Sequence, residues 1–140
     1  MGLFIHFNGN CREAVKFYSE VFGLDEPPIM TFGDTPPDPE FPLAREIKDL
    51  VMFTRLFIDD TKVMFSDIPP NMSLKIGNNT SIVIIRDNVE EIKTLFHKLK
   101  EGGSVEMDLQ KTFWSECYGT LVDKYGVSWQ LSFGDGEIPN

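Results

Sequence analysis

The chain has 140 residues, 41% hydrophobic and 25% charged, a composition typical of one globular domain or of two very small fused modules. Its 13 basic and 22 acidic residues give a net charge of −9, which argues against nucleic acid as a partner because a phosphate backbone requires a basic face. No apolar run reaches the roughly 18 residues of a membrane span, and the N-terminal residues lack a signal-peptide pattern. Two cysteines without CxxC spacing indicate reduced thiols, so we expect a cytoplasmic protein with no membrane partner.

The first 70 residues predict one strand, one helix and three further strands. Residues 3–7 are β-rich and predict the first strand. An apolar series at i, i+3, i+4 and i+7, which begins at Ala14, predicts an amphipathic helix over about 11–22 that ends at Gly23. The three further strands are expected at about 28–33, 50–58 and 62–67.

Residues 33–48 are rich in proline and acidic side chains, which disfavours a helix or a central strand there. We interpret them as an acidic surface loop. The loop is either an insertion tolerated at little entropic cost or a functional element, such as a lid or a subunit contact.

The second half repeats the first at an offset of 78 residues: Asn10 matches Asn88, and Glu13 matches Glu91. Asparagine followed by glutamate three residues later resembles a capping box, so we expect a side-chain cap on both helices. The second helix is predicted over about 89–101. The strands of this half are expected at about 81–85, 104–108, 116–123 and 126–133.

The order βαβββ, found twice, predicts an α+β fold of two modules, about 1–70 and about 78–134, within one domain over 1–140. Each helix can cover only one face of its sheet. We therefore expect the two modules to form a cupped mixed sheet around a shared cleft, where small-molecule pockets usually lie.

Three motifs carry a resemblance to a known family. They are the segment from Phe7 to Gly23, the segment from Val63 to Asp67, and the segment from Thr112 to Trp129. Their order and spacing resemble the PhnB-like branch of the vicinal oxygen chelate (glyoxalase/bleomycin-resistance) superfamily. The resemblance implies paired βαβββ modules, a homodimer, and a cavity on the concave side of the sheets. Some members are labelled 3-demethylubiquinone methyltransferase, but the chain has no glycine-rich strand-to-helix loop for a nucleoside cofactor.

Metal-dependent members of the superfamily place His or Glu on the first and last strand of each module. In this sequence the corresponding positions are Leu3, Ser81, Met64 and Gln130, and a histidine position of the PhnB-like strand before the first hairpin is Phe53. None of these side chains is a His, Asp, Glu or Cys. A divalent ion needs three or four converging ligands, so we expect neither a metal nor another cofactor.

Four other residues have both a structural and a functional interpretation. His6 is either a packed strand residue or an acid/base group, and the apolar residues around it do not decide which strand face lines the cavity. Cys11 lies at a helix N-terminus, where the dipole favours thiolate, but no base is placed beside it; Cys117 is read as structural. Arg55 either pairs with one of the acids or holds an anionic group of a ligand.

The favoured function is metal-free binding of an unidentified small organic molecule in an apolar, aromatic cavity. Contact area is expected from Phe53, Met64, Trp114 and Tyr118, and orientation from Arg55, Glu116 and Gln130. An acidic pocket would favour a cationic compound. The alternative is an isomerase or lyase with Glu116 or His6 as general base, and a third class is an interaction module without a pocket.

Overall fold

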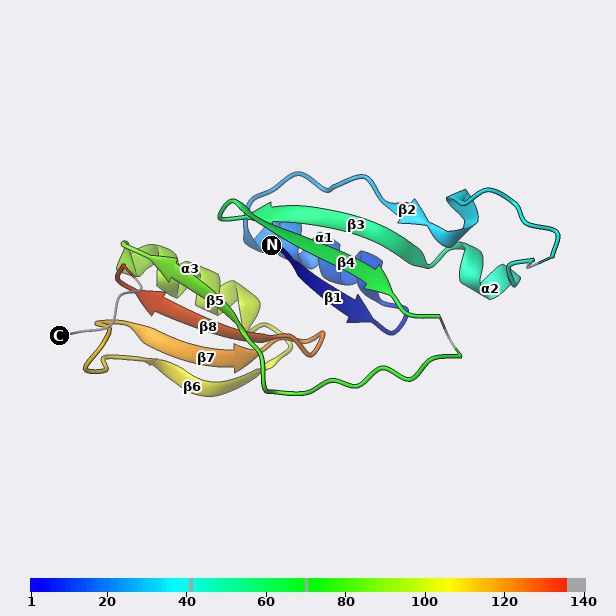
Figure 1. The fold of residues 1–140 in the computed structure, drawn as a ribbon. Coiled ribbons are helices and arrows are strands. Elements are labelled where there is room, and N and C mark those ends of the chain that lie inside the picture. Colours follow the sequence, from blue (N-terminus) through cyan, green and yellow to red (C-terminus); the bar gives the residue numbers. More distant parts are fainter. Residues whose placement is uncertain (41, 70, 136–140) are drawn as a thin grey trace. The chain divides into compact units, whose positions relative to one another are not determined.

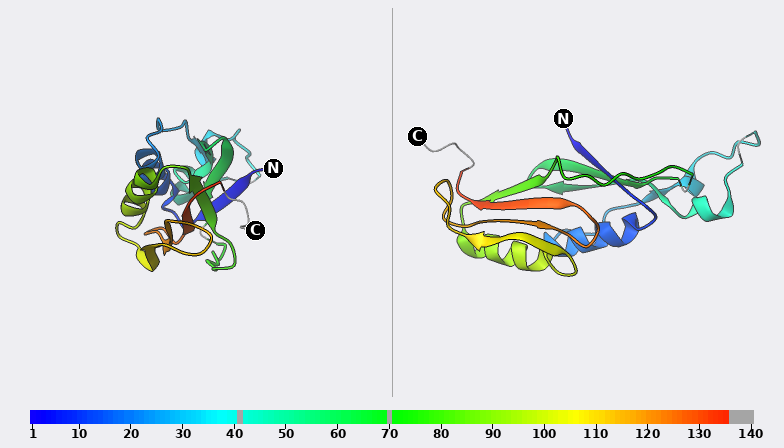
Figure 2. Two further views of the ribbon diagram at one scale, coloured as in Figure 1. Left: turned by 90° about the vertical axis from the view of Figure 1, so that its left-hand side faces the viewer. Right: turned by 90° about the horizontal axis from the view of Figure 1, so that it is seen from below.

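The computed structural model describes residues 1–40, 42–69 and 71–135, and it divides into two compact units, Met1–Lys75 and Ile76–Asn140 (Figure 1). Each unit contains a four-stranded mixed sheet with one long helix against it (Figures 1 and 2). The predicted α+β fold with two βαβββ modules is therefore confirmed. The shared cleft depends on the placement of one unit against the other and stays a prediction.

Unit 1 has the sheet order β1-β4-β3-β2, with β1 parallel to β4 and the other pairs antiparallel. Its elements are β1 (Leu3–Phe7), α1 (Cys11–Val21), β2 (Met30–Thr31), the 3-10 helix η1 (Phe32–Asp34), α2 (Arg45–Lys48), β3 (Val51–Ile58) and β4 (Thr61–Asp67). The turn between β3 and β4 is a two-residue hairpin, in which Asp59 and Asp60 both have positive φ.

Unit 2 repeats this arrangement in the order β5-β8-β7-β6, with β5 parallel to β8. Its elements are β5 (Ile82–Arg86), α3 (Val89–Leu99), β6 (Ser104–Gln110), β7 (Tyr118–Val122) and β8 (Ser128–Phe133). The described part of the chain holds no helix long and apolar enough to cross a membrane.

Each core lies between the helix and one face of its sheet. In unit 1, Tyr18 of α1 is fully buried and stacks on Phe65 of β4, with ring centroids 5.8 Å apart. In unit 2, Trp129 is buried as predicted, and its Nε1 donates to Asp123 Oδ2 at 2.8 Å. These contacts fix which face of each sheet remains outside its own core.

The two helices begin differently, although both capping residues are asparagine. Asn88 Oδ1 accepts a hydrogen bond from the backbone N–H of Glu91 at 3.2 Å, as predicted, whereas the Asn10 side chain makes no cap bond. In α1 the carboxylate of Asp67 takes this role: Oδ1 accepts from the N–H groups of Gly9 and Cys11, each at 3.0 Å.

Asp67 also joins α1 to the sheet. Its Oδ2 accepts from the backbone N–H of Val51 at 3.0 Å, so one buried carboxylate satisfies three amides from two separate segments. Asp67 pairs with Phe7, the last residue of β1, and the residue that pairs with the last residue of β5 is Phe133. Because an aromatic ring cannot accept these bonds, the cap of α3 is supplied locally.

Two predicted segments of unit 1 differ from the structure. The strand expected at about 28–33 is only Met30–Thr31, because Asp34 Oδ2 accepts from the Thr31 N–H at 2.9 Å and turns the chain into η1. The expected loop over 33–48 ends in the single helical turn α2, which begins after the last proline of the segment.

Candidate functional site

The candidate site lies on the face of the first sheet opposite α1, which we call the open face of unit 1. Residues paired across neighbouring strands share a face, so the strand register assigns each side chain. Phe4 pairs with Met64, which pairs with Arg55, while the neighbouring pairs on the helix side are buried. The strand residues of the open face are Phe4, His6, Phe53, Arg55, Phe57, Lys62, Met64 and Ser66.

Aromatic contacts hold three side chains of the open face together. Phe4 stacks on His6 with ring centroids 4.7 Å apart, and it meets Phe53 edge-on at 6.1 Å. Phe4 remains 41% exposed. Strand parity alone did not decide the orientation of His6, whereas the register places it beside the predicted contact residue Phe53.

His6 also forms a polar pair with a residue that the sequence analysis missed. His6 Nδ1 and Ser66 Oγ are 2.7 Å apart, with Ser66 buried and the imidazole exposed. A histidine hydrogen-bonded to a hydroxyl is one arrangement that general-base chemistry uses. The pairing of β1 with β4 creates this contact, so the sequence signal would have been the parallel register of the two strands.

A hollow of about 360 Å³ adjoins the open face at the junction of β2 and β3. Its lining residues are Pro28, Ile29, Met30, Asp34, Phe53, Thr54 and Arg55. Its volume falls in the range of small-molecule sites, roughly 300–1,000 Å³. Two of the predicted ligand-binding residues, Phe53 and Arg55, therefore line one depression.

Arg55 has no acidic partner among the described residues, so the salt bridge considered for it is not formed there. Its Cζ atom lies 5.8 Å from the centroid of the Phe57 ring, and the side chain is half-buried. The aromatic face supports the guanidinium and leaves its N–H donors available to an oxyanion.

In unit 2 the face opposite α3 brings three other predicted residues together. The Tyr118 hydroxyl donates to Gln130 Oε1 at 2.7 Å, and the Trp114 and Tyr118 rings meet edge-on at 5.2 Å. Thr120 pairs with Gln130 and thus lies on the same face. This group offers aromatic area beside an amide, as the sequence analysis expected of these residues.

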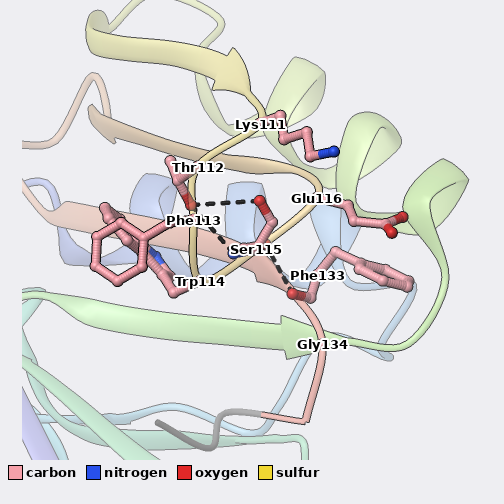
Figure 3. Close-up of a pocket in the computed structure, with 8 residues that line it drawn as sticks. All are labelled: Lys111, Thr112, Phe113, Trp114, Ser115, Glu116, Phe133 and Gly134. Atoms are coloured by element: carbon pink, nitrogen blue, oxygen red, sulfur yellow. Dashed lines mark hydrogen bonds between the residues drawn. The ribbon is translucent and has the colours of Figure 1, made fainter. Parts of the chain in front are cut away.

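Glu116 does not belong to that group. A second hollow, of about 250 Å³, is lined by residues of the 111–116 segment with Phe133 and Gly134, and its Glu116 carboxylate points away from Trp114 (Figure 3). Ser115 separates the two because its Oγ donates to the Phe133 carbonyl at 2.7 Å and so pulls the chain inward (Figure 3). Glu116 is exposed, which removes the burial that its proposed role as a general base required.

The positions that the superfamily uses for a metal do not fit one here. Leu3 pairs with buried Val63 on the face toward α1, whereas Met64 lies on the opposite face. Within the described residues, no group of three His, Cys, Asp or Glu side chains converges as a metal site would require.

The offset of 78 residues also assigned the wrong counterpart to Ser81. By register, Phe4 beside Met64 corresponds to Val83 beside Gln130, an offset of 79. The connection from β1 to α1 is one residue longer than that from β5 to α3. One extra residue before a helix therefore shifts the sequence match in the strand to the opposite sheet face.

Neither cysteine resembles an activated nucleophile. Burial raises the pKa of the Cys11 thiol above its ordinary value of 9.0, and the nearby Asp67 carboxylate raises it further. The thiolate considered for Cys11 is thus disfavoured, because the local desolvation exceeds the effect of the helix dipole. Burial likewise raises the pKa of Cys117.

Comparison with known proteins gives a match over nearly the whole chain. Residues 1–132 match the family model described as 3-demethylubiquinone-9 3-methyltransferase. A crystal structure of protein PA1353 from Pseudomonas aeruginosa is 34% identical, with a TM-score of 0.82 over 95% of this chain and 96% of that one.

Two further structures have the same fold. One, from Bacillus cereus, is described as a putative 3-demethylubiquinone-9 3-methyltransferase, PhnB protein; it is 28% identical, with a TM-score of 0.72 over 96% of this chain and 98% of that chain. The fosfomycin resistance protein FosX from Listeria monocytogenes is 12% identical, with a TM-score of 0.62 over 97% of this chain and 93% of that chain, a likeness of fold alone.

Proposed function

The chain belongs to the 3-demethylubiquinone-9 3-methyltransferase family, the PhnB-like branch of the vicinal oxygen chelate superfamily, and we propose that it binds a small organic molecule without a metal. The methyltransferase wording is the name of the family and describes no chemistry of this chain. The ligand would contact Phe53 and Met64 in unit 1, with Arg55 orienting it. Trp114, Tyr118 and Gln130 offer a second group of contacts in unit 2.

The observation that carries this proposal is the combination of Phe53 and Arg55 in one hollow beside exposed aromatic rings. Apolar walls with a few polar groups are typical of small-molecule sites. The donor set at the superfamily's metal positions supports binding without an ion, since leucine, methionine, serine and glutamine cannot together hold one.

The test uses N-phenyl-1-naphthylamine, a neutral apolar dye that fluoresces when it leaves water. We expect saturable binding to the full chain, and Phe53→Ala should weaken it about 10-fold through the lost aromatic contact area. Met72→Ala is the matched control, because Met72 is an exposed apolar side chain outside both hollows and should leave binding unchanged. Binding that is not saturable, or that is equally strong in Phe53→Ala, would contradict the proposal.

Catalysis on the same face is a second candidate function, favoured by the 2.7 Å contact between His6 Nδ1 and Ser66 Oγ. His6 would act as general base in an isomerase or lyase reaction. If a substrate screen finds turnover, a pH–rate profile lost in His6→Ala but kept in Glu116→Gln would assign the reaction to this face. The reverse result would assign it to Glu116.

A further inference from the structure

The charges of the open face of unit 1 are opposite in sign to the chain as a whole. The net charge is −9, yet the ionisable residues that the strands place on this face are Arg55, Lys62 and His6. The strand carboxylate nearest in sequence, Asp67, lies on the side of α1, where backbone amides hold both of its oxygens. The strands thus supply positive charge to this face and no negative charge.

From this arrangement we infer that the site takes an organic anion, with an apolar or aromatic body and a carboxylate or similar oxyanion group held by Arg55. The inference rests on the proposed function and names the class of its ligand. It replaces the cationic compound that the acidic composition favoured. A charge-assisted pair with a guanidinium is stronger than a neutral hydrogen bond and can be bidentate.

Two contacts prepare Arg55 for this role. The ring of Phe57, 5.8 Å from the guanidinium carbon, limits the positions that the fork can adopt. Among the described residues no carboxylate neutralises Arg55, whereas Arg86 in unit 2 has an ion pair with Glu91 at 3.5 Å. A ligand anion would therefore not have to displace a described acidic side chain from Arg55.

The hollow also contains one acid, Asp34, which does not reverse the sign of the site. Its Oδ2 accepts from the backbone N–H of Thr31 at 2.9 Å, and this hydrogen bond lowers the pKa of its carboxyl. Asp34 is therefore engaged by its own turn. Its exposure to water also screens its charge from the guanidinium. Phe53, Ile29 and Met30 form apolar wall beside these two charges.

The experiment compares three naphthalene compounds of nearly equal size and different charge: 2-naphthoate, neutral 2-naphthamide and cationic 2-naphthylmethylammonium. Each is titrated by calorimetry into the full chain at one ionic strength. We expect 2-naphthoate to bind about 10- to 100-fold more tightly than 2-naphthamide, as expected for a hydrogen bond to a charged group. The cation should bind most weakly.

Arg55→Gln should remove the preference for the anion while leaving the affinity for 2-naphthamide nearly unchanged. Arg55→Lys keeps the charge without the planar fork and should retain part of the preference. The control is Arg86→Gln, which removes an arginine from the other unit and should leave all three affinities unchanged. Circular dichroism of each variant checks that the fold is retained.

The outcomes separate this inference from the proposed function. Equal binding of 2-naphthoate and 2-naphthamide, tighter binding of the cation, or an anion preference that survives Arg55→Gln would overturn the organic anion and leave small-molecule binding in place. Binding of none of the three compounds, together with no saturable binding of the neutral dye, would overturn both.

Discussion

Cys11 shows how a single residue can have two opposing local influences. It occupies the first turn of α1, where the helix dipole stabilises a thiolate by about 0.3–1 kcal/mol. Its side chain is fully buried, and Asp67 accepts its backbone N–H, so both water and a favourable charge are withheld from the thiolate. The position of Cys11 at the helix start was readable in the sequence, but its burial and its acidic neighbour come from the packed fold.

A pH dependence of stability follows from this burial. Above pH 9.0, the ordinary pKa of the thiol, the unfolded chain releases the Cys11 proton while the folded chain keeps it. The unfolded state then binds fewer protons, so the free energy of unfolding falls as pH rises, by about 1.4 kcal/mol per pH unit from this group. We expect urea unfolding between about pH 9 and 11 to show a steeper loss in the wild type than in Cys11→Ala. Equal slopes would mean that Cys11 ionises alike in both states.

At the scale of elements, periodicity was sufficient for the two helices and turn chemistry was sufficient for the first hairpin. The apolar stripes predicted α1 and α3 to within two residues at each end, because their spacing depends only on local geometry. The cap of α1 and the length of β2 were not predictable in this way. Asp67 lies 56 residues from Cys11, and a contact at that separation exists only after the sheet has formed.

The two helix starts provide a matched pair of substitutions. We expect Asn88→Ala to lower the free energy of unfolding by about 1 kcal/mol, because the Glu91 amide loses its cap. Asn10→Ala should change it by less than about 0.5 kcal/mol, since the Asn10 side chain is exposed and makes no cap bond. Urea unfolding followed by far-ultraviolet circular dichroism measures both. Equal losses would show that Asn10 caps α1 in solution.

At the scale of the whole molecule, the repeat predicted the fold class, whereas the candidate site depended on the pairing of strands. A single offset applied to both halves placed Leu3 opposite Ser81, although these residues lie on non-equivalent faces of their sheets. The residues on the open face of unit 1 come from three strands separated along the chain. No spacing rule groups Phe4, Phe53 and Ser66, so two of these three were absent from the predicted site.

The proposal for the whole protein includes its assembly and its metal content, and native mass spectrometry measures both at once. We expect the mass of two chains, as the family resemblance implies, without a stoichiometric transition metal. The donor set at the superfamily's metal positions is the reason for the second expectation. Stoichiometric zinc, nickel, iron or manganese retained in the native spectrum, and lost with the fold, would refute it.

The carboxylate of Asp67 has a consequence for the order of events during folding. The bonds that complete the first turn of α1 join residues 56 and 58 positions apart, while the bond that caps α3 joins residues only three apart. Closing the longer loops costs more chain entropy, and that cost is met only when β4 has docked. Initiation of α3 is therefore a local event, and completion of α1 is coupled to long-range chain closure.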